Sequence, residues 1–175
     1  MRTLALVATV ALFAPVAAAE PPSPIARAEK GDVMCYQPDA ARKTCQSTAS
    51  YKTLPNGQVR NSTVVLVGIK PVVVMETATL VTIRNGQLCG PLKASDIDRA
   101  TYTVDGVPAT PKQTELLHQQ MMDSMATLLN ADLCTTYVPS GNGLTSREAV
   151  DGVNQPKLDE HVIWVSRSDG YKVAP

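Results

Sequence analysis

Aromatic residues are scarce in this chain of 175 residues. They make up 4% of the sequence, and the single Phe, Phe13, lies close to the N-terminus. Beyond that point the chain carries one Trp, Trp164, and five Tyr. Bases and sugars are commonly bound by stacking on aromatic rings. The shortage of rings therefore argues against a protein that binds glycans or single-stranded nucleic acid.

The sequence also lacks an excess of positive charge. It holds 16 Lys and Arg against 16 Asp and Glu, and its basic residues never gather in a run longer than two. Proteins that bind nucleic acid neutralise several phosphates at once, and proteins that dock on anionic lipids use similar basic clusters. We therefore expect no nucleic-acid partner and no electrostatic docking on a membrane.

No hydrophobic run is long enough for a transmembrane segment, but the N-terminus resembles a cleaved export signal. Arg2 precedes an apolar stretch over 4–14, and Ala17 to Ala19 form a small-residue cleavage site. The apolar stretch is about 11 residues long, whereas a membrane-spanning helix needs about 20. Cleavage near Ala19 would leave a mature chain that begins at Glu20. A lipoprotein would need a cysteine at that point, and the first cysteine is Cys35.

The leader sets the expected location and domain organisation. We expect a signal peptide over 1–19, a flexible leader over 20–32 that is rich in Pro, Ala and charge, and one domain over 33–175. The alanine-rich leader is typical of bacterial precursors. The predicted location is the periplasm, with release to the medium as the alternative.

Cysteine is used sparingly, and no C-x-x-C motif occurs, which argues against a thioredoxin-like redox site. The four cysteines form an even set in a chain that we expect to be exported, and such sets usually pair as disulfides. Three pairings are open, and we favour Cys35–Cys45 with Cys89–Cys134. The alternative is a zinc site with all four as ligands, but the sequence has none of the short C-x2-C spacings of zinc knuckles.

Turn signals divide the middle of the chain into β-strands. Asn56-Gly57 and Asn85-Gly86 each separate two runs rich in Thr and Val, a pattern that predicts hairpins. The stretch 139–155, with three glycines, is expected to be a surface loop. A last hairpin is expected over 161–173, in which Trp164 and Tyr171 would face each other.

One long amphipathic helix is predicted from Pro111 to about Asn130. Thr110 and Gln113 form a capping box at its start, and Leu and Met recur at helical spacing along it. Strand runs with one dominant helix indicate an α+β fold, in which an antiparallel sheet built from hairpins packs against the helix.

The predicted helix carries one candidate metal site. His118, Met121, Met122 and Met125 lie within one sector of the helix surface, and imidazole with thioether ligands suits Cu(I). The alternative is that this face packs on the sheet, with methionines filling gaps in the core. Core packing is the default for such a face, so no metal and no cofactor is assigned.

Catalytic candidates are few and carry no motif. Ser140 beside Gly141, His161 behind Asp159 and Glu160, and His118 are the only residues that we can name for a nucleophile and base. The sequence has no G-x-S-x-G, S-x-x-K or H-E-x-x-H motif. We therefore expect a non-catalytic binding or interaction module whose partner is an envelope protein or a small ligand. A periplasmic hydrolase with a His base is the alternative, followed by a copper-handling protein.

Overall fold

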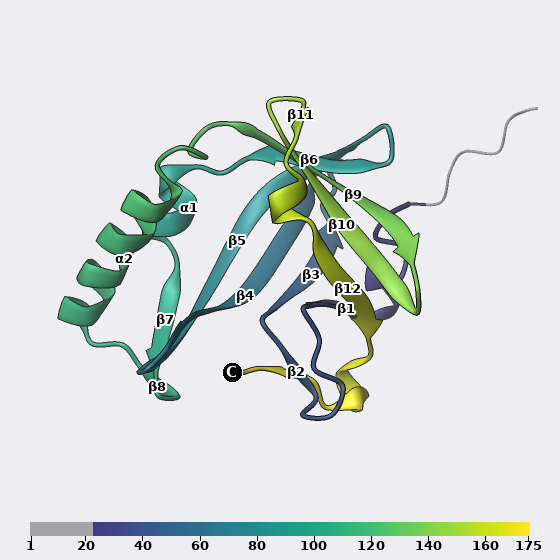
Figure 1. The fold of residues 1–175 in the computed structure, drawn as a ribbon. Helices are drawn as coiled ribbons and strands as arrows, with labels where there is room; N and C mark the ends of the chain where they lie inside the picture. Colours follow the sequence, from purple (N-terminus) through teal and green to yellow (C-terminus); the bar gives the residue numbers. More distant parts are fainter. Residues whose placement is uncertain (1–22) are drawn as a thin grey trace, which may run out of the picture.

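The computed structural model describes residues 23–175, and within them the chain is mostly β. Strands account for 51% of the structure and helices for 19%. Eight antiparallel strands form a closed barrel (Figure 1) in the spatial order β4, β3, β1, β12, β10, β9, β6, β5, and pairing of β5 with β4 closes the circle. Their bounds are β1 (Val33–Tyr36), β3 (Ser47–Thr53), β4 (Val59–Ile69), β5 (Val72–Arg84), β6 (Gln87–Pro91), β9 (Asp132–Ser140), β10 (Gly143–Val150) and β12 (Glu160–Val165).

Shorter helices and strands lie outside the eight-stranded barrel. The predicted signal peptide at 1–19 lies outside the described residues, as do the next three positions. The other elements are η1 (Ala28–Lys30), β2 (Thr44–Cys45), α1 (Ala94–Asp98), β7 (Thr101–Val104), β8 (Val107–Pro108), α2 (Pro111–Met125), β11 (Val153–Asn154), η2 (Pro156–Leu158), η3 (Arg167–Asp169) and β13 (Lys172–Val173). None of the described helices is both long enough and apolar enough to span a membrane.

The expectation of an α+β sheet packed on one long helix is wrong. The stretch 139–155, expected to be a surface loop, completes β9 and contains all of β10, and these two strands pair along their length. β10 then pairs with β12, which pairs with β1, so the sheet curls until it meets itself. A closed barrel buries its apolar face against itself and needs no helix to cover it.

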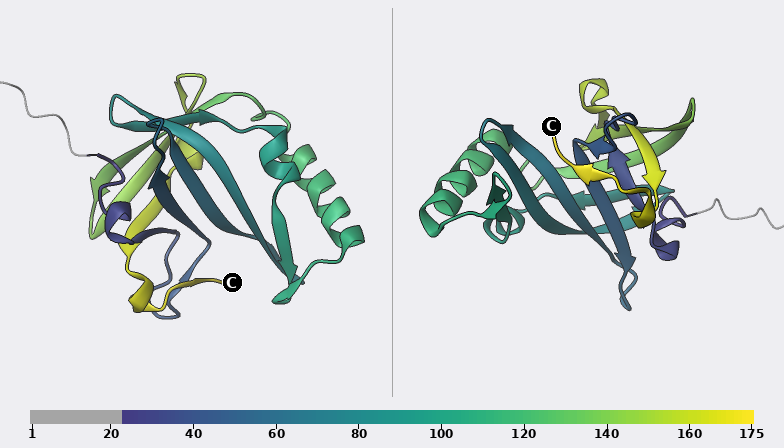
Figure 2. Two further views of the ribbon diagram at one scale, coloured as in Figure 1. Left: turned by 180° about the vertical axis from the view of Figure 1, so that it is seen from behind. Right: turned by 90° about the horizontal axis from the view of Figure 1, so that it is seen from below.

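The helix α2 forms as predicted at its start but plays a smaller part. The capping box of Thr110 and Gln113 is present, and the helix ends at Met125 rather than near Asn130. It lies beside β7 and away from β9, β10 and β12 (Figure 2). Leu117 and Met121 contact a small apolar cluster, yet no residue of α2 is fully buried. The helix therefore covers an extension of β4 and β5 and not the barrel core.

The hairpin signals are confirmed at both predicted positions. Turns at Asn56-Gly57 and Asn85-Gly86 join β3 to β4 and β5 to β6. Asn85 and Gly86 both have positive φ, at 51° and 77°. Asn and Gly tolerate that conformation best, which explains why this sequence pair is a reliable hairpin signal.

Both predicted disulfides are present. Cys35 is bonded to Cys45 and Cys89 to Cys134, which is the favoured pairing. Cys89 and Cys134 lie directly opposite each other on β6 and β9. The second bridge thus joins two neighbouring strands of the barrel.

The predicted terminal hairpin is wrong. β12 pairs with β1 and β10, while β13 pairs in parallel with β2. Trp164 lies opposite Met34 in the barrel, and Tyr171 packs near the Cys35–Cys45 bridge. The two rings therefore do not face each other, because each belongs to a different side of the barrel wall.

The main core lies inside the barrel and is continuous with its cavity. Its fully buried members include Met34, Ala49, Val59 and Val162, and Ile25 joins them with 1% of its surface exposed. Residues 23–32, predicted as part of a flexible leader, form turns and η1, and place Ile25 in the barrel. The described part of the leader is therefore packed against the domain.

Candidate functional site

A cavity of about 160 Å³ lies in the barrel lumen. Seven of the eight barrel strands contribute lining residues, with β12 the exception. Its wall is mixed: Val81, Leu88 and Leu133 are apolar, while a second group of side chains brings polar atoms into the lumen. This polar group consists of Tyr36, Tyr51, Asn61, Thr79, Thr135, Tyr137 and Glu148.

The alternation of the strands explains which residues reach the cavity. Successive side chains of a strand point to opposite faces, so Leu133, Thr135 and Tyr137 of β9 all point inward. The register places Thr135 opposite Glu148 of β10. Antiparallel partners share a face, and Glu148 therefore also points into the lumen.

Three tyrosine hydroxyls meet at one point of the lumen. The Tyr137 hydroxyl oxygen lies 2.6 Å from that of Tyr36 and 2.9 Å from that of Tyr51, and the latter two are 3.4 Å apart. The sulfur of Met34 lies 3.8 Å from the Tyr36 oxygen and 3.7 Å from the Tyr51 oxygen. We call Tyr36, Tyr51 and Tyr137 the tyrosine triad.

Counting protons shows what the triad can offer to a ligand. Each hydroxyl has one proton to donate and can accept at two lone pairs. If the three protons are used among the three oxygens, the triad keeps spare lone pairs and no spare proton. Burial raises the pKa of all three hydroxyls, for Tyr36 and Tyr137 well above the usual value, so they stay neutral.

Glu148 is the one acidic side chain that lines the cavity. Its Oε2 accepts a hydrogen bond of 2.8 Å from the Thr135 hydroxyl. Burial, with a smaller effect of the nearby Glu160 and Asp159, raises the pKa of Glu148 to about 7, whereas hydrogen bonds from Thr135 and Ser146 act in the opposite direction. Glu148 therefore changes charge close to neutral pH.

A second acidic group lies beside Glu148. Glu160 of β12 pairs with Ser146 of β10. Ser146 precedes Glu148 by two residues, so Ser146, Glu148 and Glu160 lie on the same face of the barrel wall. Burial raises the pKa of Glu160 as well, while a hydrogen bond from Gln37 opposes the rise. The electrostatic environment of this part of the lumen is therefore acidic.

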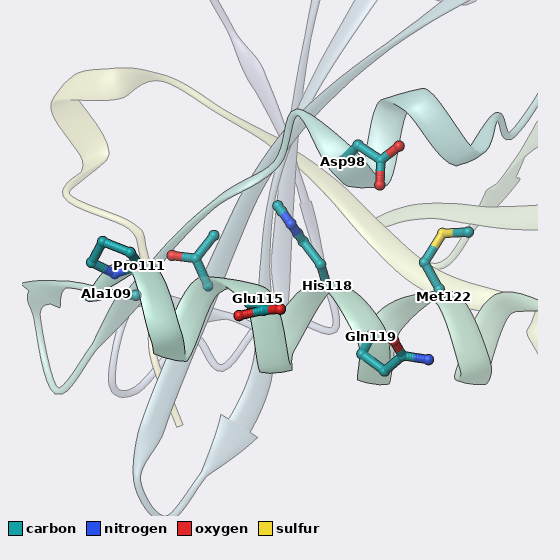
Figure 3. A pocket seen from close by; sticks show the side chains of 8 residues that line it. Asp98, Ala109, Pro111, Glu115, His118, Gln119 and Met122 are labelled. Atoms are coloured by element: carbon teal, nitrogen blue, oxygen red, sulfur yellow. The ribbon is translucent and has the colours of Figure 1, made fainter.

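His118 packs against Ala100 and Tyr102, and its side chain also lines a hollow on the surface beside α2. Its Nε2 lies 3.1 Å from the carbonyl oxygen of Ala100, and its ring meets Tyr102 edge-on with 5.3 Å between ring centres. Figure 3 shows His118 pointing away from α2, with Asp98 on the facing helix α1. Met121 packs in the apolar cluster under α2, and Met122 lines a hollow on the outside of the molecule.

The other catalytic candidates are separated from one another. His161 lies on the outer face of β12 opposite Thr145, and Ser140 is exposed at the end of β9. In the described part of the chain no hydrogen bond joins Ser140, His118 and His161 to one another. Within residues 23–175, no three His, Cys, Asp or Glu side chains gather as a metal site of those ligands would require.

A second hollow, beside α2, is larger but belongs to the surface. It measures about 590 Å³ and is lined by His118, Met122 and several exposed residues, among them Pro111, Glu115 and Gln119 (Figure 3). One helix face supplies most of its wall. We give the lumen more weight, because its wall comes from seven strands and its polar groups point to a common centre.

Sequence reasoning missed every polar residue of the lumen. The triad comes from β1, β3 and β9, and its members are up to 101 positions apart in the chain. The one local signal for this site is Glu148, a charged residue at an inward-facing position of a strand. The sequence predicts a loop over 139–155, so it does not reveal that Glu148 faces inward. No protein-family model, curated protein or solved structure matches the chain.

Proposed function

We propose that the protein is a non-catalytic binding protein that holds a small molecule in the barrel lumen. The observation that carries the proposal is the convergence of Glu148 and the tyrosine triad on one cavity. Barrels of eight strands have an interior that is either filled by side chains or able to hold one small ligand. Ligand sites typically combine an apolar wall with a few polar groups that fix the orientation of the ligand.

The size of the cavity limits what can enter it. About 160 Å³ is many times the space that one water molecule needs, but less than the roughly 300–1,000 Å³ of pockets for drug-sized ligands. The ligand is therefore a molecule of few heavy atoms, or a larger molecule that inserts one group.

The wall of the cavity is well suited to binding because it is rigid. Every strand that lines it is hydrogen-bonded to a neighbour on both sides, and the Cys89–Cys134 bridge joins two of them. A site that is formed before the ligand arrives spends little free energy on ordering side chains.

Three four-carbon probes test the proposal: n-butylammonium, 1-butanol and butyrate. In an NMR titration, at least one probe should shift the resonances of Thr135, Tyr137 and Glu148. We expect a dissociation constant of about 1–10 mM, because a ligand with so few atoms gains little binding energy. Val81→Phe fills the lumen and should abolish the shifts. The matched control is Leu80→Phe, one position along β5 on the exposed outer face, which should leave them unchanged. Absence of lumen shifts with all three probes would refute the proposal.

We further propose that the protein works outside the cytoplasm, in the periplasm of a bacterium. The leader over 1–19 and two disulfides support this, because disulfides persist in oxidising compartments. Expression with the full leader should release the protein on osmotic shock with Glu20 as its first residue. Four free thiols in the unreduced protein, or an intact Met1 in the cytosolic fraction, would contradict this location.

A further inference from the structure

The lumen contains a carboxylate and no basic side chain to neutralise it. Glu148 lines the cavity, and among the described residues that line it there is no Lys, Arg or His. Arg147, the next residue along β10, is exposed on the opposite face of the wall. Buried carboxylates are usually paired with a cation or with several hydrogen-bond donors. Glu148 has no cation beside it, and only two hydroxyls oppose the rise of its pKa, that of Thr135 at 2.8 Å and, more weakly, that of Ser146.

The groups around Glu148 bring no positive charge to it, because the other polar side chains that line the lumen, the three tyrosines with Asn61, Thr79 and Thr135, are neutral. If the three hydroxyl protons bond within the tyrosine triad and to Met34, the triad presents lone pairs to the cavity. Glu160 and Asp159, the other ionisable groups near Glu148, are acidic. The lumen is thus complementary to a molecule that brings both positive charge and several N–H donors.

From this geometry we propose that the lumen binds a primary ammonium group, held between the Glu148 carboxylate and the oxygens of the tyrosine triad. The inference rests on the proposed function, which requires only that some small molecule enters. A primary ammonium carries three N–H donors, enough to bond the carboxylate and two hydroxyl oxygens at once. The apolar tail of such a ligand would lie against Val81, Leu88 and Leu133.

Other classes of ligand fit the lumen less well. A carboxylate or phosphate would be repelled by Glu148 and its acidic neighbours, and the triad has no free donor for it. An alcohol offers a single donor and no charge. A quaternary ammonium has the charge but no N–H group to donate to the carboxylate or the hydroxyl oxygens.

Protons should compete with the ligand for Glu148. Since Glu148 titrates near pH 7, ammonium binding should strengthen as the pH rises from 6 to 8 and level off above that. The groups that face Glu148 act in the same direction or not at all. Burial raises the pKa of the three tyrosine hydroxyls, which stay neutral, and the negative charges of Glu160 and Asp159 favour an ammonium as the pH rises.

The experiment compares four probes on three proteins at pH 8. n-Butylammonium should bind the unmodified mature chain at least tenfold more tightly than 1-butanol, butyrate and tetramethylammonium, as followed by chemical shifts of the triad rings. Glu148→Gln should weaken n-butylammonium at least tenfold and leave 1-butanol unchanged. The control Glu115→Gln removes a carboxylate from the outer hollow and should change nothing.

Three other outcomes of this experiment would contradict one or both proposals. If 1-butanol or butyrate binds in the lumen as tightly as n-butylammonium, the ammonium proposal is wrong and the binding function stands. If n-butylammonium binding depends on Glu115, the site is the α2 hollow and the lumen proposal fails. If no probe shifts lumen resonances in any protein, both proposals fall.

Discussion

Glu148 and the tyrosine triad belong to the polar part of the lumen wall, which also includes Asn61, Thr79 and Thr135. The triad satisfies its own hydrogen bonds and costs little. Glu148 differs, because its ionised form has only hydroxyl donors beside it, from Thr135 and Ser146, and faces acidic neighbours. A residue that weakens the fold at neutral pH is most simply explained by a ligand that compensates it.

Replacing Glu148 by Gln should change how stability depends on pH. The folded-state pKa of about 7 lies above the usual 4.5, so the folded protein holds this proton more tightly than the unfolded chain. Stability should therefore fall as the pH rises from about 4.5 to about 7, by up to about 3 kcal/mol, and then level off. Urea unfolding at pH 4.5, 6 and 8 should show most of this slope disappear in Glu148→Gln.

The matched control for this measurement is Glu115→Gln on the exposed surface of α2. It should retain the slope of the unmodified protein. Glu160 also has a raised pKa, so a weaker slope in the same direction should persist in Glu148→Gln. A full slope in Glu148→Gln would mean that the carboxylate is solvated and that the lumen is not as closed as described.

Tyr137→Phe should destabilise the protein by about 1–2 kcal/mol. Tyr137 has the two shortest contacts in the triad, and its loss leaves the hydroxyls of Tyr36 and Tyr51 with each other and with Met34. Tyr171→Phe, outside the barrel near the first disulfide, is the comparison and should stay within about 0.5 kcal/mol of the unmodified protein. Equal effects of the two substitutions on chemical denaturation would argue against a structural role for the triad.

At the scale of single elements, the sequence predicted local features well and β10 not at all. Hairpin turns at Asn56-Gly57 and Asn85-Gly86 and the start of α2 depend on a few adjacent residues, so their signals are local. β10 alternates Leu144, Ser146 and Glu148 toward the lumen. With only one apolar residue among these three, its inward face does not stand out from the sequence as a core strand.

Ile25 anchors the segment before β1 to the barrel core, although the composition of that segment predicts a flexible leader. It is 1% exposed and packs in the barrel core, whereas Ile69, at the end of β4, is 65% exposed. Ile25→Ala should cost about 2–4 kcal/mol, because it leaves a cavity in a closed barrel, and Ile69→Ala less than about 1 kcal/mol. Thermal or urea unfolding of the mature chain measures both. A loss below 1 kcal/mol for Ile25→Ala would indicate that the segment does not close the barrel.

The two disulfides should differ in how much they stabilise the fold. Cys89–Cys134 spans 45 residues and Cys35–Cys45 spans 10. In the chain-entropy model these loops correspond to about 4 and about 3 kcal/mol. Paired Cys→Ala substitutions of each bridge, compared by urea unfolding, should therefore show the larger loss for Cys89–Cys134. The reverse order would mean that strain or residual structure outweighs loop length.

The candidate site exists only at the scale of the whole molecule. Tyr36, Tyr51, Tyr137 and Glu148 lie on four different strands, and they meet because β5 pairs with β4 to close the barrel. Periodicity and motifs describe one segment at a time, so they could predict the disulfides and turns but not this convergence. The histidines and methionines that the sequence singled out lie outside the lumen.

The proposed binding function requires that a small molecule binds in the lumen and not in the α2 hollow. Intermolecular nuclear Overhauser effects between n-butylammonium and the mature protein at pH 8 test this directly. We predict cross-peaks from the butyl protons to Val81, Leu88 and the ring of Tyr137. Cross-peaks confined to His118 and Met122, or none at all, would contradict the account.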